Sequence, residues 1–141
     1  MAGKLTLEVV TPEHLLFSQE VDEVIATGTE GEFGVLPGHC HFLSTLRIGE
    51  LRYRMGDTWS YMSVLWGFAE VTPTKITLLA EIAEKAEDID IDRARATVEK
   101  AQKRLEMGGL ASELEEARIS LEKARLRQQI AERAQRSKTS H

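Results

Sequence analysis

The sequence has one cysteine and three prolines, and it lacks any apolar run near the roughly 20 residues that a membrane-spanning helix needs. A single cysteine, Cys40, excludes an internal disulfide and is typical of a reducing compartment. The N-terminus has no apolar targeting segment. We therefore expect a cytoplasmic protein whose association with a membrane comes only through partners.

Residues suited to metal or catalytic chemistry are also few. His39, Cys40 and His41 lie together, but zinc needs three or four ligands, and His14 and His141 are distant in sequence. No serine stands in a recognisable nucleophile context such as G-x-S-x-G. We expect no metal site and no catalytic residues, so the protein is not predicted to be an enzyme.

Negative charge predominates but is unevenly placed, with a formal net charge of −5 for the whole chain. Residues 1–87 carry 6 Lys and Arg against 13 Asp and Glu, whereas residues 118–141 carry 7 against 2. An acidic body with a basic tail is a poor profile for nucleic-acid binding. It suits a tail that docks on an acidic protein surface.

Strand-like segments predominate in residues 1–86. Leu5, Leu7 and Val9 alternate with polar residues, which predicts a half-buried strand. Similar segments follow at regular spacing, with no helical period between them, at residues 15–17, 21–27, 42–46, 49–54, 58–65, 67–71 and 75–80. This pattern predicts an all-β N-terminal domain, a sandwich or barrel, over residues 1–86.

A glycine-rich run lies between these segments and reads Gly28-Thr29-Glu30-Gly31-Glu32-Phe33-Gly34-Val35-Leu36-Pro37-Gly38-His39. Its four glycines and one proline predict tight turns, several of them at positive φ. We expect Phe33, Val35 and Leu36 to pin this run onto the core. Glu30 and Glu32 are then expected to point outward on a stiff ridge.

The periodicity becomes helical in residues 87–141. Asp88 or Asp90 can cap a first helix, whose apolar face comprises Ile91, Ala94, Val98, Ala101 and Leu105. The pair Gly108-Gly109 is expected to end this helix and to form the turn. The sequence therefore predicts an α-helical hairpin after the sandwich.

A second helix is predicted from the capping-box spacing Ser112-x-x-Glu115 to about Arg136. The face that meets the first helix comprises Leu114, Ala117, Leu121, Ala124, Gln128 and Ala131. Because both faces are rich in alanine, they bury little area and hold the helices together weakly. A second apolar stripe, formed by Ile119, Leu126 and Ile130, either packs on the sandwich or serves a hairpin that opens and binds elsewhere.

Two motifs carry a resemblance to a known family. The glycine-rich run resembles the signature loop of epsilon subunits of bacterial F-type (rotary, proton-translocating) ATP synthases, whose mitochondrial counterpart is called delta. At the start of the first helix, Ile89-Asp90-x-x-Arg93-Ala94 is similar to a nucleotide motif of some bacterial epsilon subunits. The resemblance extends over essentially the whole chain.

The resemblance implies that ATP is a regulatory ligand rather than a required cofactor. The positions that match the family's ligands are Glu84, Asp90, Arg93, Lys100, Lys123 and Arg127. An aspartate can accept hydrogen bonds from adenine or ribose, and arginine binds phosphate through two parallel hydrogen bonds. Lys100 and Lys123 stand in place of arginine and lose that fork geometry. In the alternative interpretation, Asp90 only caps the helix and Arg93 forms a local salt bridge.

The resemblance also implies a non-catalytic rotor subunit that couples rotation of the c-subunit ring to ATP synthesis. The sandwich would bind the gamma subunit, with Glu32 and His39 on the side of the c-ring. The extended hairpin would inhibit ATP hydrolysis by entering the alpha/beta head, where the beta subunit would meet Arg118, Lys123, Arg125, Arg127 and Arg133. Such a subunit is peripheral, at the cytoplasmic face of the bacterial inner membrane.

Two positions depart from the family's pattern. Trp66 stands where a glycine is common, and His41 replaces a common proline. Trp59 and Trp66 also allow an alternative in which a free-standing sandwich binds a ligand such as a carbohydrate and the helices form a dimerisation tail. This alternative predicts a protein that does not travel with a membrane complex.

Overall fold

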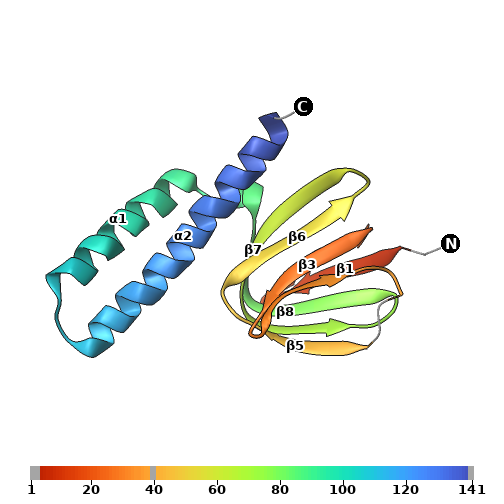
Figure 1. The fold of residues 1–141 in the computed structure, drawn as a ribbon, viewed down its shortest axis with the longest axis horizontal. Helices are drawn as coiled ribbons and strands as arrows, with labels where there is room; N and C mark the ends of the chain where they lie inside the picture. The colour runs from red at the N-terminus through yellow and green to blue at the C-terminus, as the bar shows by residue number, and fades with distance from the viewer. Residues whose placement is uncertain (1–3, 39–40, 140–141) are drawn as a thin grey trace. The chain divides into compact units, whose positions relative to one another are not determined.

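The computed structural model describes residues 4–38 and 41–139, with side chains as far as residue 136. The chain divides after Lys85 into two compact units, Met1–Lys85 and Ala86–His141. We call these the sandwich unit and the helical unit, and we describe each by itself (Figure 1). The fold class predicted from the sequence, a β-sandwich followed by a helical hairpin, is confirmed.

The sandwich unit contains eight described strands, which are β1 (Leu5–Val10), β2 (Leu15–Val21), β3 (Glu23–Gly28), β4 (Gly31–Val35), β5 (Phe42–Leu46), β6 (Gly49–Met55), β7 (Thr58–Val71) and β8 (Lys75–Lys85). Their order is β2-β1-β8-β7-β5-β3-β4, and β6 pairs with β3 and β7. The pair of β1 and β8 is parallel, and the other strand pairs among the described residues are antiparallel.

The core of the sandwich unit is made of aliphatic side chains that alternate along the strands. On β1, Leu5, Leu7 and Val9 are fully buried, as the alternation predicted. On β8, Ile76 and Leu78 are also fully buried. Because alternate side chains of a strand point to one face, these residues form a continuous apolar layer.

Strand β7 is continuous, whereas the sequence predicted two strands separated at Trp66. Its first half pairs with β6 as far as Val64, and its second half pairs with β5 from Gly67 onward. At this change of partner, Trp66 has a φ of 46°, in the region that favours glycine. The glycine that is common at this position in the resembled family agrees with this φ. The prediction missed the continuity because the two halves of β7 pair with different strands.

Gly67 allows β7 and β8 to approach each other closely. A Cβ atom added at Gly67 would lie 1.7 Å from the carbonyl oxygen of Leu79, which no packing arrangement tolerates. Both atoms at this contact are set by the backbone, so no side chain can turn aside. The pair Trp66-Gly67 therefore combines a strained backbone with a close strand contact.

The glycine-rich run has the predicted turns, at residues 29–30 and 37–38, and the predicted positive φ at Gly31 and Gly38, but between the turns it forms strand β4, which was not predicted. Gly31 begins β4 with a φ of 122°, and β4 pairs with β3 in register from Gly28 opposite Gly31. Val35 is fully buried and Phe33 packs against the core, as expected. The expectation for Leu36 is wrong, because this side chain follows the end of β4 and is 53% exposed.

The helical unit contains a short 3₁₀ helix, η1 (Ala86–Asp88), and the two predicted helices, α1 (Ile91–Met107) and α2 (Ala111–Thr139). Asp90 rather than Asp88 caps α1. Helix α2 begins one residue before Ser112, so the predicted capping box lies inside its first turn and the prediction of that start is wrong. None of the helices in the described ranges has the length and apolar character required to cross a membrane.

The seam between α1 and α2 is made mainly of alanine. Its buried side chains are Ala94, Ala101, Ala117, Leu121, Ala124 and Ala131. The other predicted seam residues, among them Val98 and Leu105, are half-buried. In the second apolar stripe, Ile119 and Leu126 are half-buried and Ile130 is fully buried, so this stripe is only partly exposed.

Candidate functional site

Asp90 lies at the N-terminus of α1, where its side chain is exposed. Its Oδ1 atom accepts a hydrogen bond from the backbone N–H of Arg93 at 3.1 Å. This bond satisfies one of the N–H groups that the first turn of a helix leaves unpaired. The capping role is therefore present, and it occupies one of the two carboxylate oxygens.

Arg93 has an exposed side chain, and within residues 4–38 and 41–136 it forms no ion pair. The local salt bridge considered for it belongs instead to Arg95, which lies 3.8 Å from Asp92 and 3.2 Å from Glu132. The guanidinium group of Arg93 thus keeps its full set of donors for a ligand.

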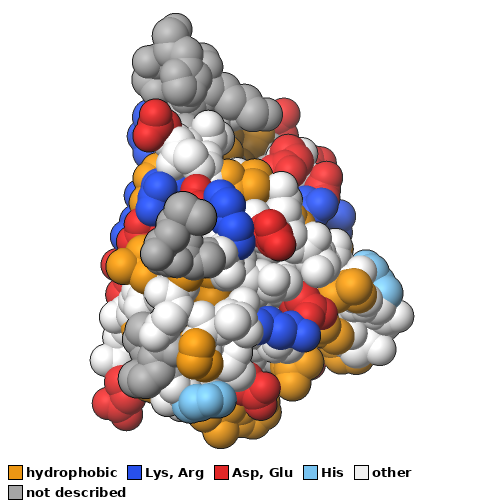
Figure 2. Space-filling model, turned by 90° about the vertical axis from the view of Figure 1, so that its right-hand side faces the viewer, with side chains coloured by type: hydrophobic (Ala, Val, Ile, Leu, Met, Phe, Trp, Pro, Cys, Tyr) orange, Lys and Arg blue, Asp and Glu red, His pale blue; other side chains and the backbone are white. Residues whose placement is uncertain are grey.

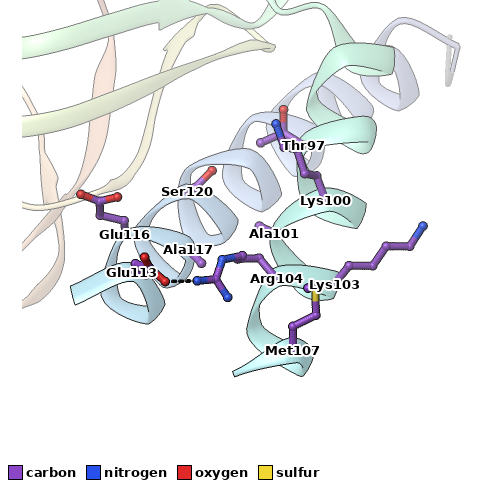
Figure 3. A pocket seen from close by; sticks show the side chains of 10 residues that line it. All are labelled: Thr97, Lys100, Ala101, Lys103, Arg104, Met107, Glu113, Glu116, Ala117 and Ser120. Carbon is purple, nitrogen blue, oxygen red and sulfur yellow. Dashed lines mark hydrogen bonds and ion pairs between the residues drawn. The ribbon is translucent and has the colours of Figure 1, made fainter. Parts of the chain in front are cut away.

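A groove runs between α1 and α2 near the turn of the hairpin, with a volume of about 760 Å³ (Figure 3). Lys100 lines it, together with Lys103 and Arg104 from the same helix. The side chain of Arg104 donates to the carbonyl oxygen of Gly108 at 2.6 Å and reaches across to Glu113 on α2. Arg104, which was not among the predicted site residues, therefore links α1 to the turn of the hairpin and to α2.

Helical spacing places four of the six predicted ATP ligands on the side of the hairpin that carries this groove. On α1, steps of four and three residues form a single row, Arg93, Thr97, Lys100 and Arg104. On α2, the same steps form a second row, Glu116, Ser120, Lys123 and Arg127. Because groove-lining residues belong to both rows, Arg93, Lys100, Lys123 and Arg127 share that side.

The basic residues of α2 divide between two faces, although the sequence analysis treated them as one run. Arg118 and Arg125, seven residues apart, are exposed on one face, and Arg133 lies close to that face. Lys123 and Arg127 belong to the groove side, are half-buried and already interact within the chain. Arg118 lies 3.3 Å from Glu115, in an ion pair that is open to solvent.

The sixth candidate, Glu84, belongs to the sandwich unit. It is half-buried near the end of β8, lies directly opposite Ser63 of β7, and has an interaction within the chain. The candidate ATP ligands are thus contributed by both units. A group of three or more His, Cys, Asp or Glu residues that suits a metal ion is not found in residues 4–38 and 41–139.

Glu32, the predicted docking residue, is exposed on β4 and is paired within its own sheet. Its Oε1 atom lies 3.1 Å from Nη2 of Arg52 on β6, and Arg52 also lies 3.7 Å from Glu50. No sequence pattern predicted Arg52 as the partner of Glu32. His39, the other predicted docking residue, lies outside the described residues.

An exposed apolar surface lies on the outer face of β5, β7 and β8. Phe68 is 51% exposed and pairs directly with Leu79, which is 49% exposed, while Leu43 on β5 is 68% exposed. Figure 2 shows one face of the molecule, on which hydrophobic side chains reach the surface between charged ones. The signal for Phe68 was its alternation with the buried Ala69 and Val71, which the sequence analysis left unused.

Comparisons with known families give one consistent result for both units. The β-sandwich domain of the ATP synthase delta/epsilon chain matches residues 4–86, and the long alpha-helix domain of the same chain matches residues 87–132. The protein belongs to the ATP synthase delta/epsilon chain family. The resemblance drawn from the two sequence motifs is thereby confirmed.

Individual relatives narrow the family to its epsilon chains. The ATP synthase epsilon chain of Syntrophobacter fumaroxidans is 47% identical, over 94% of this chain and 99% of the relative. That of Citrifermentans bemidjiense is 48% identical, over 96% of this chain and 99% of the relative. The function predicted at its coarser level, an epsilon chain of ATP synthase, is therefore confirmed.

Two solved structures share the fold. A chain in the Euglena gracilis mitochondrial ATP synthase, solved as OSCP, F1 and c-ring, has a TM-score of 0.77 at 22% identity, with 94% of this chain and 81% of that chain covered. A chain in the Tetrahymena thermophila mitochondrial ATP synthase central stalk and c-ring has a TM-score of 0.61 at 12% identity, with 92% and 98% covered.

Proposed function

We propose that this protein is a non-catalytic central-stalk subunit that binds the gamma subunit and sits on the c-ring, at the cytoplasmic face of a bacterial inner membrane. The observation that carries this proposal is the apolar surface formed by Leu43, Phe68 and Leu79. Contiguous exposed apolar side chains mark sites of protein association. The two similar structures, one of an assembly with OSCP, F1 and c-ring and one of a central stalk with c-ring, support the same partners.

The test is the affinity of the purified protein for the gamma subunit. Phe68→Ser is expected to weaken binding at least tenfold, because an aromatic anchor is lost from the surface centre. Leu15→Ser is the matched control, since Leu15 is 54% exposed on β2. Equal weakening by both substitutions, or none by either, argues against this docking face.

The helical unit is proposed to inhibit ATP hydrolysis by opening and entering the alpha/beta head. Its alanine seam buries little area, which keeps the opening free energy small. The row formed by the exposed Arg118 and Arg125 and the half-buried Arg133 is then the surface that meets acidic residues of the beta subunit. Neutralising this row by substitution to Gln is expected to raise ATPase activity of the assembled complex. Unchanged activity contradicts the assignment.

ATP is proposed to bind as a regulatory ligand and to favour the closed hairpin. Support comes from the shared side of Arg93, Lys100, Lys123 and Arg127, because four cations on one side suit a triphosphate. Calorimetric titration of ATP into the full chain tests this. Arg93→Ala is expected to abolish saturable binding, whereas the control Arg95→Ala, which removes an existing ion pair, is expected to retain it.

Asp90 needs a separate design because it also caps α1. Asp90→Ala removes the cap, with a cost of about 1 kcal/mol, and it removes the proposed ligand as well. Asp90→Asn keeps a capping side chain but removes the charge. If Asp90→Asn binds ATP like the wild type, the carboxylate is a cap and not a ligand.

A further inference from the structure

Arg104 lies in the last turn of α1, and its guanidinium group contacts both the connecting turn and α2. Its Nη1 atom donates to the carbonyl oxygen of Gly108 at 2.6 Å, and its Nη2 atom forms an ion pair with Glu113 in the first turn of α2. Figure 3 shows the side chain of Arg104 reaching from one helix to the other at this ion pair. One side chain therefore joins the end of α1, the turn and the start of α2.

The turn leaves room for this side chain because residue 109 is glycine. A Cβ atom added at Gly109 would lie 3.1 Å from Nη2 of Arg104 and 3.2 Å from Oε2 of Glu113. Both distances are tighter than those of most Cβ contacts, so a larger residue would push the two charged groups apart. The bare backbone of Gly109 thus lets the guanidinium and carboxylate groups meet beside the turn.

The electrostatics of the two helix ends favour the same pair. The C-terminus of a helix carries a partial negative charge and the N-terminus a partial positive charge, so they stabilise a cation and an anion respectively. Arg104 is at the C-terminal end of α1 and Glu113 at the N-terminal end of α2. The hydrogen bond to the Gly108 carbonyl also satisfies an acceptor at the end of α1, where a helix leaves such groups unpaired.

These contacts oppose separation of the two helices. Arg104 belongs to α1 and Glu113 to α2, so the ion pair breaks when α2 moves away from α1. The alanine side chains of the seam bury little apolar area, so they oppose this movement only weakly. The contacts of Arg104 are therefore a sizeable part of what keeps the hairpin closed.

We propose that the contacts of Arg104 with Gly108 and Glu113 form a latch that holds the helical hairpin closed at its turn. This inference rests on the proposed opening of the helical unit, and it names the residues that oppose that opening. The ion pair is partly open to solvent, since the two side chains are 35% and 49% exposed, so salt screens it. The hairpin is therefore expected to open more readily as the salt concentration rises.

The test measures how often the seam opens in the full chain. Ala124 is 3% exposed, so a thiol introduced by Ala124→Cys in a Cys40→Ser background reacts with a thiol reagent mainly when the seam opens. Arg104→Ala is expected to raise the rate of this reaction about fivefold, the effect of losing a partly exposed ion pair. Equal rates with and without Arg104→Ala overturn the inference.

Lys103→Ala is the matched control for this measurement. Lys103 is the neighbouring cation and also lines the groove, but it pairs with Glu99 of its own helix at 3.2 Å. This substitution is expected to leave the reaction rate unchanged, because it removes no contact between α1 and α2. If Lys103→Ala accelerates the reaction as much as Arg104→Ala does, loss of any cation from α1 is sufficient and the latch is overturned.

Charge reversal separates the latch from a general loss of stability. Arg104→Glu and Glu113→Arg each place two like charges at the turn, so each is expected to accelerate the thiol reaction more than Arg104→Ala. The two substitutions together restore an ion pair of reversed polarity. They are expected to return the rate part of the way, because the hydrogen bond to Gly108 is lost and the helix dipoles oppose the reversed charges. A double variant that reacts faster than both single variants contradicts the latch.

The dependence on salt gives a second readout of the same contact. Sodium chloride is expected to accelerate the thiol reaction in the otherwise unchanged chain, because it screens the ion pair between Arg104 and Glu113. This acceleration is expected to be smaller with Arg104→Ala, which has already lost the pair. An equal dependence on salt in the two proteins overturns the role of the ion pair.

The ATPase activity of the assembled complex distinguishes this inference from the proposed inhibition. If the open hairpin inhibits ATP hydrolysis, Arg104→Ala is expected to lower the ATPase activity. A faster thiol reaction with unchanged ATPase activity supports the latch and contradicts inhibition by the open hairpin. An unchanged thiol reaction overturns the latch, whatever the ATPase activity.

Discussion

The sandwich unit and the helical unit differ in how much apolar surface each buries in its own interior. The sandwich unit buries large aliphatic side chains, such as Leu7, Val24 and Leu78, completely. The helical unit buries mainly alanine along the seam between its helices. Leu121 is the largest of the buried side chains in that seam. Since stabilisation scales with buried apolar area at about 25 cal/mol per Å², the sandwich is the rigid unit and the hairpin the adaptable one.

The largest effect is expected for Gly67→Ala in the sandwich unit. The new Cβ atom meets the backbone of β8, so strands β7 and β8 have to separate and the protein loses more than about 3 kcal/mol or fails to fold. Urea denaturation followed by tryptophan fluorescence measures this. Gly34→Ala is the control, because its Cβ atom meets only Ile25 at 3.9 Å. Equal stability of the two variants contradicts the close contact.

A direct comparison of the units comes from two leucines. Leu78→Ala is expected to cost about 3 kcal/mol, because it leaves a cavity in a closed core. Leu121→Ala is expected to cost roughly 1–2 kcal/mol, because two helices can close onto the space that it leaves. Circular dichroism at increasing urea checks both values. A larger loss for Leu121→Ala reverses the ranking of the units.

An intermediate effect is expected at Trp66, where the backbone and the ring are tested separately. Trp66→Gly and Trp66→Ala both remove the ring, but glycine tolerates a φ of 46° without strain. We expect the glycine variant to be more stable than the alanine variant by about 1 kcal/mol. Thermal unfolding measures this difference. Identical melting temperatures mean that the backbone relaxes once the ring is gone.

The smallest effect is expected from acid titration of one carboxylate in each unit. In the sandwich unit, hydrogen bonds from Lys4 and from the backbone N–H of Gly56, both 2.7 Å, hold the pKa of Asp22 below its usual value. In the helical unit, hydrogen bonds from Gln128 and then Arg95, both 3.2 Å, lower the pKa of Glu132.

The sign of the pH dependence follows from these lowered values. A carboxylate whose pKa is lower in the folded state stabilises the protein above its unfolded pKa, and this stabilisation is lost as pH falls through the folded pKa. Asp22→Asn and Glu132→Gln should therefore lose less stability than the wild type below about pH 4. Urea denaturation at several pH values checks this. A steeper loss in either variant contradicts the assignment.

Alternating and helical periods predicted most of the fold. The alternation of Leu5, Leu7 and Val9 and the seam spacing of Ala94 and Ala101 correspond to buried faces in the structure. Local periodicity was sufficient for these elements because each buries one regular face.

The errors occurred where long-range pairing decides the conformation. Strand β4 was not predicted, because its two glycines are typical of turns. Its pairing with β3 is set by the strand register, which composition does not show. The continuity of β7 through Trp66 depends on two different partner strands. Ser63 of β7 lies opposite both Glu50 of β6 and Glu84 of β8, and no local pattern in the sequence reveals such neighbours on three strands.

Strand β7 also has a mechanical consequence. Its first half is hydrogen-bonded to β6 and its second half to β5. A force that shears the sandwich unit is therefore resisted by one continuous strand and by the hydrogen bonds along both halves. Slippage of β7 along the sheet would require many of these hydrogen bonds to break together. A force that pulls on either end of β7 is therefore shared between the strands on both sides of the sandwich unit.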